Sequence, residues 1–277
     1  MRDTRDMLLV LLSSLLMLTG CSRRDILDDY PVSGVEISLD WNGVTNKLPE
    51  GVRVIFYPKN AEGRKIDTYL SVKGGKVKVP PGRYSVVVYN YDTETVQIRG
   101  EEAYETIEAF TGHCNGLGIA GTEQLVWGPD PLYVVRIDDL KIENSEEELQ
   151  LNWKPKLVVK TYSFKLKVQG LEYVSSIVGS IEGMSSCYDL GLGCGKAGDS
   201  PIYFAARGSA GEVTGSFTVF GTSEGVISRA GNAIKLTLAF VKTDNKVQKM
   251  EVDITEVIIR KVVAAVVMMT VMSLSKK

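Results

Sequence analysis

The chain has 277 residues, of which 44% are hydrophobic, and a formal net charge of −2. At roughly 150 residues per domain this length predicts one or two domains, and the apolar fraction is sufficient for real cores. The small net charge favours neither nucleic acid nor an anionic membrane surface as a partner. The sequence contains one histidine, which excludes a multi-histidine metal site. We therefore expect no metal, no cofactor and no enzymatic activity.

The first twenty residues have the pattern of an export signal. Basic residues Arg2 and Arg5 precede the stretch 7–18, which is an almost continuous apolar run. That run has the length of a signal-peptide core and is too short to cross a bilayer, which takes about 20 residues. It ends in Leu18-Thr19-Gly20-Cys21, which resembles the bacterial lipobox. This resemblance implies cleavage of a signal peptide at residues 1–20 and acylation of Cys21; an ordinary cleaved signal and an uncleaved anchor are the alternatives.

Three cysteines remain if Cys21 is acylated. Export would place Cys114, Cys187 and Cys194 in an oxidising compartment, where disulfides persist. Cys187 and Cys194 flank a short glycine-containing loop and could form a bridge. Cys114 would then be left over, an odd count for an exported protein.

Residues 21–33 are polar and predict a tether, and strand patterns follow over residues 34–155. The segment 83–89 would be apolar on both faces of a strand, which predicts a central strand. The glycine-rich segment 111–128 predicts a long loop. Further strands are expected over residues 35–41, 52–57, 69–72, 76–79, 95–98, 105–110 and 132–137.

A second strand-rich unit is expected over residues 156–255, with the boundary near Lys154-Pro155. Tyr162, Phe164, Leu166 and Val168 share one face of a long predicted strand. Strands at about 8–12-residue spacing, with turn residues between them and no long helical pattern, predict antiparallel β-sandwiches. The tail at 256–277 contains an apolar run, residues 262–272, that is about half the length of a membrane span. We expect a buried strand or helix there; an edge strand offered to a partner, or a shifted reading frame, are alternatives.

The candidate ligand sites are weak. His113 is adjacent to Cys114, but neighbouring residues on a strand or loop generally point apart, which argues against a nucleophilic pair. The segment 191–195 is glycine-rich but is not followed by a helix, so it does not predict a phosphate loop. The remaining candidates are the tryptophans Trp41, Trp127 and Trp153, which with Tyr89 and Tyr91 could stack on a glycan, although aromatic residues in strands usually belong to the core.

Several motifs resemble a known family. The segment 78–84 (Lys-Val-Pro-Pro-Gly-Arg-Tyr) runs into 89–94 (Tyr-Asn-Tyr-Asp-Thr-Glu), and Trp127-Gly128-Pro129-Asp130-Pro131 follows. Behind a lipobox, this pattern resembles uncharacterised lipoproteins of Bacteroidales that are similar to the FimB-type anchor and accessory lipoproteins of fimbriae. The resemblance covers most of residues 34–255. The tail beyond Ile254 departs from it.

That resemblance implies two tandem transthyretin-like or immunoglobulin-like sandwich domains, at 34–155 and 156–255, and a role at the outer membrane in fimbrial anchoring or assembly. The expected partner is a fimbrial subunit held by strand addition, in which an exposed sheet edge gives main-chain hydrogen bonds. The alternative function is a surface glycan-binding lipoprotein. Ser22-Arg23-Arg24 stands where surface lipoproteins of that phylum carry acidic residues, so the sequence does not decide between the periplasmic and the surface face.

Overall fold

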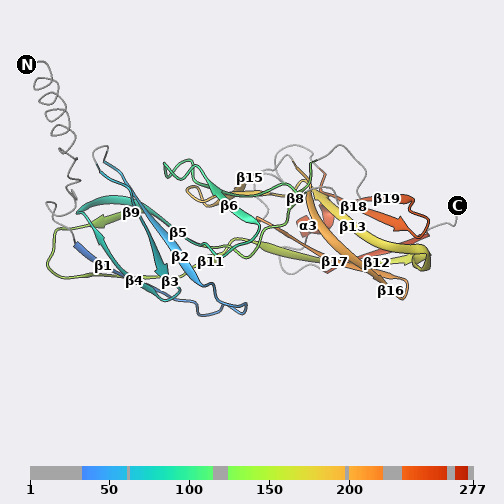
Figure 1. Cartoon of the computed structure of the whole chain (residues 1–277), viewed down its shortest axis with the longest axis horizontal. Helices are drawn as coiled ribbons and strands as arrows, with labels where there is room; N and C mark the ends of the chain where they lie inside the picture. The colour runs from blue at the N-terminus through green and yellow to red at the C-terminus, as the bar shows by residue number, and fades with distance from the viewer. Residues whose placement is uncertain are drawn as a thin grey trace, which may run out of the picture.

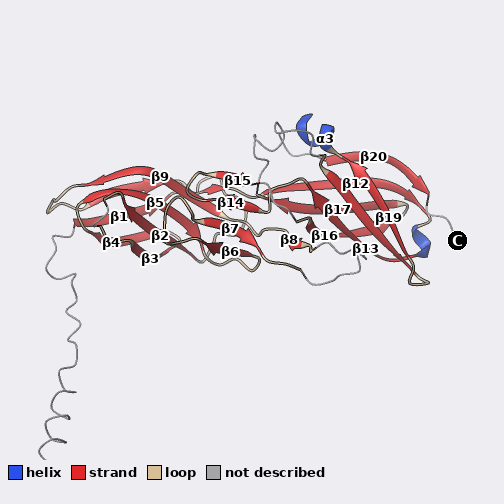
Figure 2. Cartoon of the chain, turned by 90° about the horizontal axis from the view of Figure 1, so that it is seen from above, coloured by secondary structure: helices blue, strands red, loops and turns tan. Residues whose placement is uncertain are grey.

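The computed structural model describes residues 33–60, 63–114, 124–196, 200–220, 233–260 and 266–273. This part of the chain is almost entirely β-structure, arranged as an elongated molecule with one large sheet at each end and a smaller sheet between them (Figures 1 and 2). Most neighbouring strands are antiparallel. The prediction of an antiparallel all-β protein is therefore confirmed.

The first sheet has eight strands in the order β10-β1-β4-β3-β2-β5-β9-β11. They are β1 (Ser33–Leu39), β2 (Gly51–Pro58), β3 (Ile66–Ser71), β4 (Gly74–Val79), β5 (Gly82–Asn90), β9 (Tyr133–Ile142), β10 (Leu149–Trp153) and β11 (Lys156–Leu157). Strand β5 lies between β2 and β9, and its last seven residues are buried. Val86 and Val88 face one core and Val87 and Tyr89 face another, which confirms the predicted central strand.

The second sheet has eight strands. β8 (Val126–Trp127) pairs with β16, and the other seven lie in the order β19-β18-β13-β16-β17-β12-β20. They are β12 (Lys160–Gln169), β13 (Val174–Glu182), β16 (Ile202–Ser209), β17 (Glu212–Val219), β18 (Lys235–Lys242), β19 (Val247–Asp253) and β20 (Val266–Ser273). Tyr162, Phe164, Leu166 and Val168 of β12 are all buried in its core, as their alternation predicts. A single turn of 3-10 helix, η2 (Leu171–Tyr173), follows β12.

The middle sheet is built from both halves of the sequence. Its order is β15-β14-β7-β6, with β6 (Val96–Arg99) and β7 (Glu108–Thr111) from the first half and β14 (Cys187–Asp189) and β15 (Cys194–Lys196) from the second. The sheet covers the outer face of β2 and β5, and Leu190 and Phe220 are fully buried in the shared core. We call the pairing of β7 with β14 the seam.

A strand from the first half of the sequence also joins the second sheet. The two-residue strand β8 (Val126–Trp127) comes from the first half but pairs in parallel with β16 of the second sheet. A Cβ on the next residue, Gly128, would lie 2.6 Å from the Thr218 hydroxyl of β17, so β8 enters where β16 and β17 separate. Val126 is buried in the core of the second sheet. Strand pairing therefore crosses the predicted boundary at 155–156, and two of the cores contain residues from both halves. The core around Phe56 and Trp153 is built from the first half alone.

The tail contains both kinds of element that the sequence left open. A short helix, α3 (Thr255–Arg260), follows β19, and β20 then pairs in parallel with β12 at the other edge of the sheet. The tail therefore forms an edge strand. Residues 261–265 and 274–277 lie outside the described ranges.

Ion pairs reinforce the seam. The buried Glu108 carboxylate of β7 accepts hydrogen bonds from Lys196 of β15, at 2.7 Å, and from Arg99 of β6. Lys196 also lies 3.1 Å from the buried Asp189 carboxylate of β14. Burial by itself raises the pKa of Glu108, but the hydrogen bonds from Lys196 and Arg99 outweigh it, so the pKa lies below the ordinary value of 4.5. All four strands of the middle sheet are thus joined through one carboxylate cluster.

Because the pKa of Glu108 is lower in the folded state, its stabilising contribution is complete above pH 4.5 and is lost as the pH falls through the folded pKa. We predict that Glu108→Gln lowers the free energy of unfolding near neutral pH by about 1–2 kcal/mol, since Lys196 and Arg99 are partly exposed and can rehydrate. The difference from the wild type should shrink on acidification below pH 4.5. Urea unfolding at several pH values measures it.

Glu143→Gln is the matched control, because Glu143 pairs with Lys141 at 2.6 Å on the exposed surface. Because solvent screens this exposed pair, the variant should lose much less stability than Glu108→Gln at every pH. A Glu108→Gln variant indistinguishable from this control would contradict the role given to the seam cluster.

Candidate interaction edges and surfaces

The predicted lipidation site, Cys21, and the signal peptide lie outside the described residues. Within the described ranges, no helix is long and apolar enough to cross a membrane. The acylation of Cys21 therefore stays a prediction.

The three other cysteines are free thiols in the structure. Cys187 and Cys194 lie on the paired strands β14 and β15, but Cys187 is opposite Lys196 and Cys194 is opposite Asp189. This register offsets the two cysteines by two residues, so the bridge expected from their spacing is not formed. Cys114 is buried, and burial raises the pKa of its thiol.

His113 is exposed whereas the adjacent Cys114 is buried, as expected for neighbours that point apart. In the described part of the chain, no group of three or more histidine, cysteine or acidic residues is placed to hold a metal ion.

The three tryptophans have different surroundings. Trp153 is buried in the core of the first sheet, and Trp41 is partly buried, with its indole N–H donating to the Val72 carbonyl at 2.6 Å. Trp127 is partly exposed and packs edge-on against Tyr203 of the second sheet. The candidates thus belong to two different sheets, and the structure does not gather them into a common stacking platform.

The two family motifs contact one another. The Asn90 side chain donates to Asp92 at 3.0 Å and to the Pro131 carbonyl at 3.2 Å, and it accepts the Tyr133 N–H at 2.7 Å. The Asp130 carboxylate accepts the N–H groups of Glu94 and Thr95, both at 2.6 Å. These side chains fix the chain as it leaves β5 and enters β9.

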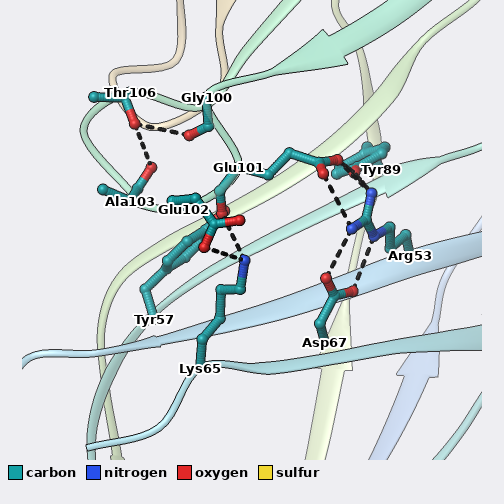
Figure 3. A network of polar contacts seen from close by, with 10 residues as sticks. All are labelled: Arg53, Tyr57, Lys65, Asp67, Tyr89, Gly100, Glu101, Glu102, Ala103 and Thr106. Atoms are coloured by element: carbon teal, nitrogen blue, oxygen red, sulfur yellow. Dashed lines mark hydrogen bonds and ion pairs between the residues drawn. The ribbon is translucent and has the colours of Figure 1, made fainter. Parts of the chain in front are cut away.

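A polar network fixes the loop between β6 and β7 on the first sheet (Figure 3). Arg53 of β2 binds Asp67 of β3 through two hydrogen bonds of 2.7 and 2.9 Å, and it also contacts Glu101 of the loop. The Tyr57 hydroxyl donates to the Glu101 carbonyl at 2.9 Å, and burial raises the pKa of Tyr57. No spacing in the sequence indicated this network, because its members come from three separate segments.

The sheet edges differ in charge, and charged residues on an edge strand oppose pairing with another chain. β11 pairs with only the first two residues of β9, and the remainder of β9 carries Arg136, Asp138, Asp139 and Lys141. The edge strand β19 carries Lys249, Glu251 and Asp253. In contrast, β10 and β20 contain no charged residue; β10 has five residues and β20 has eight. Among the edge strands described, β20 is the longest without a charge.

Strand β20 pairs with β12 along one edge, and no other described strand pairs with it. Its sequence, Val-Val-Met-Met-Thr-Val-Met-Ser, is largely apolar. A strand of this kind has free main-chain N–H and C=O groups, and natural proteins usually protect such an edge. Among the described residues, no strand covers this edge of the second sheet, which lies at the end far from β1 (Figure 2).

Comparison with known proteins identifies the family. A family model described as a domain of unknown function, DUF5119, matches residues 20–205. A Bacteroides ovatus protein that carries the provisional name fimbrium anchoring subunit Fim4B is 63% identical over 270 residues, which cover 93% of this chain and 81% of that protein.

Solved structures agree with this fold. A crystal structure of a candidate adhesin from Bacteroides ovatus ATCC 8483 is 57% identical, has a TM-score of 0.79, and is matched over 93% of this chain and 94% of that one. The fimbrial anchor protein Mfa2 of Porphyromonas gingivalis is 11% identical with a TM-score of 0.51, covering 84% and 85% of the two chains; it shares the fold alone. The chain therefore belongs to the DUF5119 family, as a homologue of Fim4B of Bacteroides ovatus.

Proposed function

We propose that the chain is a fimbrial anchor or accessory lipoprotein, held in the outer membrane by fatty acids on Cys21, which binds a fimbrial subunit by strand addition at β20. The observation that carries the proposal is the open, uncharged edge of β20. The provisional name of the 63% identical relative supports the fimbrial role. A non-enzymatic function is also supported by that relationship.

Strand addition suits this edge for a physical reason. A partner strand laid along β20 would satisfy the N–H and C=O groups that β12 leaves unpaired on the other side. The apolar character of β20 adds burial to those hydrogen bonds, at about 25 cal/mol per Å² of apolar surface removed from water. The charged residues of β9 and β19 would direct the partner away from the other long edges.

The first described strand and the proposed binding edge lie at opposite ends of the described part of the chain (Figure 2). β1, the first described element after Cys21, belongs to the first sheet, whereas β20 is at the far end of the second (Figure 2). Residues 21–33 would connect the lipid to the first sheet, and the seam would connect the two sheets. Such an arrangement would hold the partner away from the bilayer. Stable anchoring takes more than one acyl chain, so we expect Cys21 to carry several.

We predict that Cys21→Ala abolishes fatty-acid incorporation and releases the protein from the membrane fraction, because the apolar run before it is too short to span the bilayer. Metabolic labelling with a palmitate analogue, followed by membrane fractionation, measures both effects. Cys114→Ala is the control and should label and fractionate like the wild type. Full labelling of the Cys21→Ala protein would contradict the anchoring proposal.

Proline scanning tests the edge. Successive N–H groups of a strand point to opposite sides, so prolines at Met268 and Met269 remove donors from opposite edges of β20. One variant should disturb pairing with β12 and lose stability. The other should stay folded in the membrane and recover about tenfold less fimbrial subunit in pull-downs, which corresponds to about 1.4 kcal/mol.

Prolines at Lys249 and Met250 of the edge strand β19 are the matched controls. The folded variant among them should recover the fimbrial subunit like the wild type. The strand-addition proposal fails if every folded β20 variant also retains wild-type recovery.

A further inference from the structure

Two exposed tyrosines lie together on the outer face of the first sheet. Tyr69 of β3 is 60% exposed and Tyr91, which follows β5, is 45% exposed. Their ring centroids are 5.3 Å apart and the rings are nearly perpendicular, at 81°. Large aromatic side chains gain little from such exposure in a folded monomer, and tyrosine is enriched where proteins bind other molecules. We call Tyr69 and Tyr91 the exposed tyrosine pair.

The polar network around Arg53 lies beside the exposed tyrosine pair and holds Tyr69 in place. The Arg53 guanidinium lies 5.5 Å from the Tyr69 ring centroid, and its hydrogen bonds to Asp67, Glu101 and Tyr89 use all of its donor atoms (Figure 3). Arg53 therefore supports Tyr69 and has little capacity to bind a ligand itself. On the other side, a Cβ at Gly51 would lie 2.7 Å from the Tyr91 hydroxyl. Because position 51 has no side chain, the Tyr91 ring can lie close to β2.

The charges beside the exposed tyrosine pair disfavour charged ligands. The carboxylates of Asp67 and Glu101 bind Arg53 at its edge and would repel a phosphate, a sulfate or an acidic sugar. A cation on the Tyr69 ring would meet the Arg53 guanidinium that already interacts with the same ring, and the two like charges would repel. An uncharged ligand meets neither penalty.

We propose that the exposed tyrosine pair binds a neutral glycan. Such a ligand offers apolar C–H faces to the exposed rings, and its hydroxyls can donate to the free lone pairs of Asp67 and Glu101, since an ionised carboxylate has about four acceptor sites. The nearly perpendicular rings suit a sugar held at two faces better than a flat stack along one plane. This proposal does not depend on the fimbrial role or on β20.

The test is affinity electrophoresis of the full chain in detergent through gels containing dextran, mannan, xylan or β-glucan, with heparin and oligolysine as charged probes. At least one neutral polysaccharide should retard the wild type, and neither charged probe should bind. Replacing both residues, Tyr69→Ala with Tyr91→Ala, should weaken the binding by at least about tenfold, the loss expected for two aromatic contacts of about 0.5–1.5 kcal/mol each.

Two further variants separate loss of binding from loss of fold. Tyr69→Phe with Tyr91→Phe keeps the rings and should bind within about threefold of the wild type. Leu157→Ala removes an exposed apolar side chain elsewhere on the same sheet and should bind normally. The proposal would be overturned if no neutral polysaccharide bound, or if heparin or oligolysine bound at the exposed tyrosine pair. Unchanged glycan binding by the double alanine variant would also overturn it. So would a double alanine variant whose only defect is the recovery of a protein partner.

Discussion

The pairing of β7 with β14 is the constraint on which the rest of the structure depends. The two strands come from different halves of the sequence, yet they share a sheet, a core with Leu190 and Phe220, and the Glu108 cluster. β8 makes the reciprocal connection in the second sheet. Because each half supplies residues that the other needs, the two large sheets are held in one body. A sheet formed only from local hairpins would have allowed them to separate.

That single body explains how an anchor of this shape could transmit a load. In the proposed function, force enters through Cys21 at the first sheet and leaves through β20 at the end of the second. Between them lie the backbone hydrogen bonds of the seam and the ion pairs of Glu108 and Asp189 with Lys196. Buried pairs of this kind contribute to specificity of arrangement more surely than to net stability. Here they connect strands that are short and polar and would pair weakly alone.

Much of the fold could be predicted from the sequence because the pattern of half-buried strands is local. The alternation in β12 identified a strand with one buried face, and the doubly apolar β5 identified a central strand. The two family motifs lie in contact, because the Asn90 side chain binds the backbone of Pro131 and Tyr133. Family membership agreed with the resemblance carried by those motifs.

What the sequence could not show depends on register and long-range pairing. β14 and β15 have three residues each, too few for a period-2 pattern, so the seam was not visible and a boundary at 155–156 was the simplest interpretation. The offset of Cys187 from Cys194 follows from the hairpin register and not from their spacing. The sequence named Tyr91 as a candidate for glycan stacking but not its neighbour Tyr69, because the two residues meet only when β3, β2 and β5 are side by side.

Hydrogen–deuterium exchange of the membrane-extracted protein, with and without its fimbrial subunit, tests the central claim most directly. The amides of β20, residues 266–273, should exchange more slowly when the subunit is bound, because a strand laid along the open edge satisfies them. The amides of β19, residues 247–253, should be unaffected. Unchanged exchange in β20 together with new protection in β19 or β9 would contradict the account and place the partner on a charged edge.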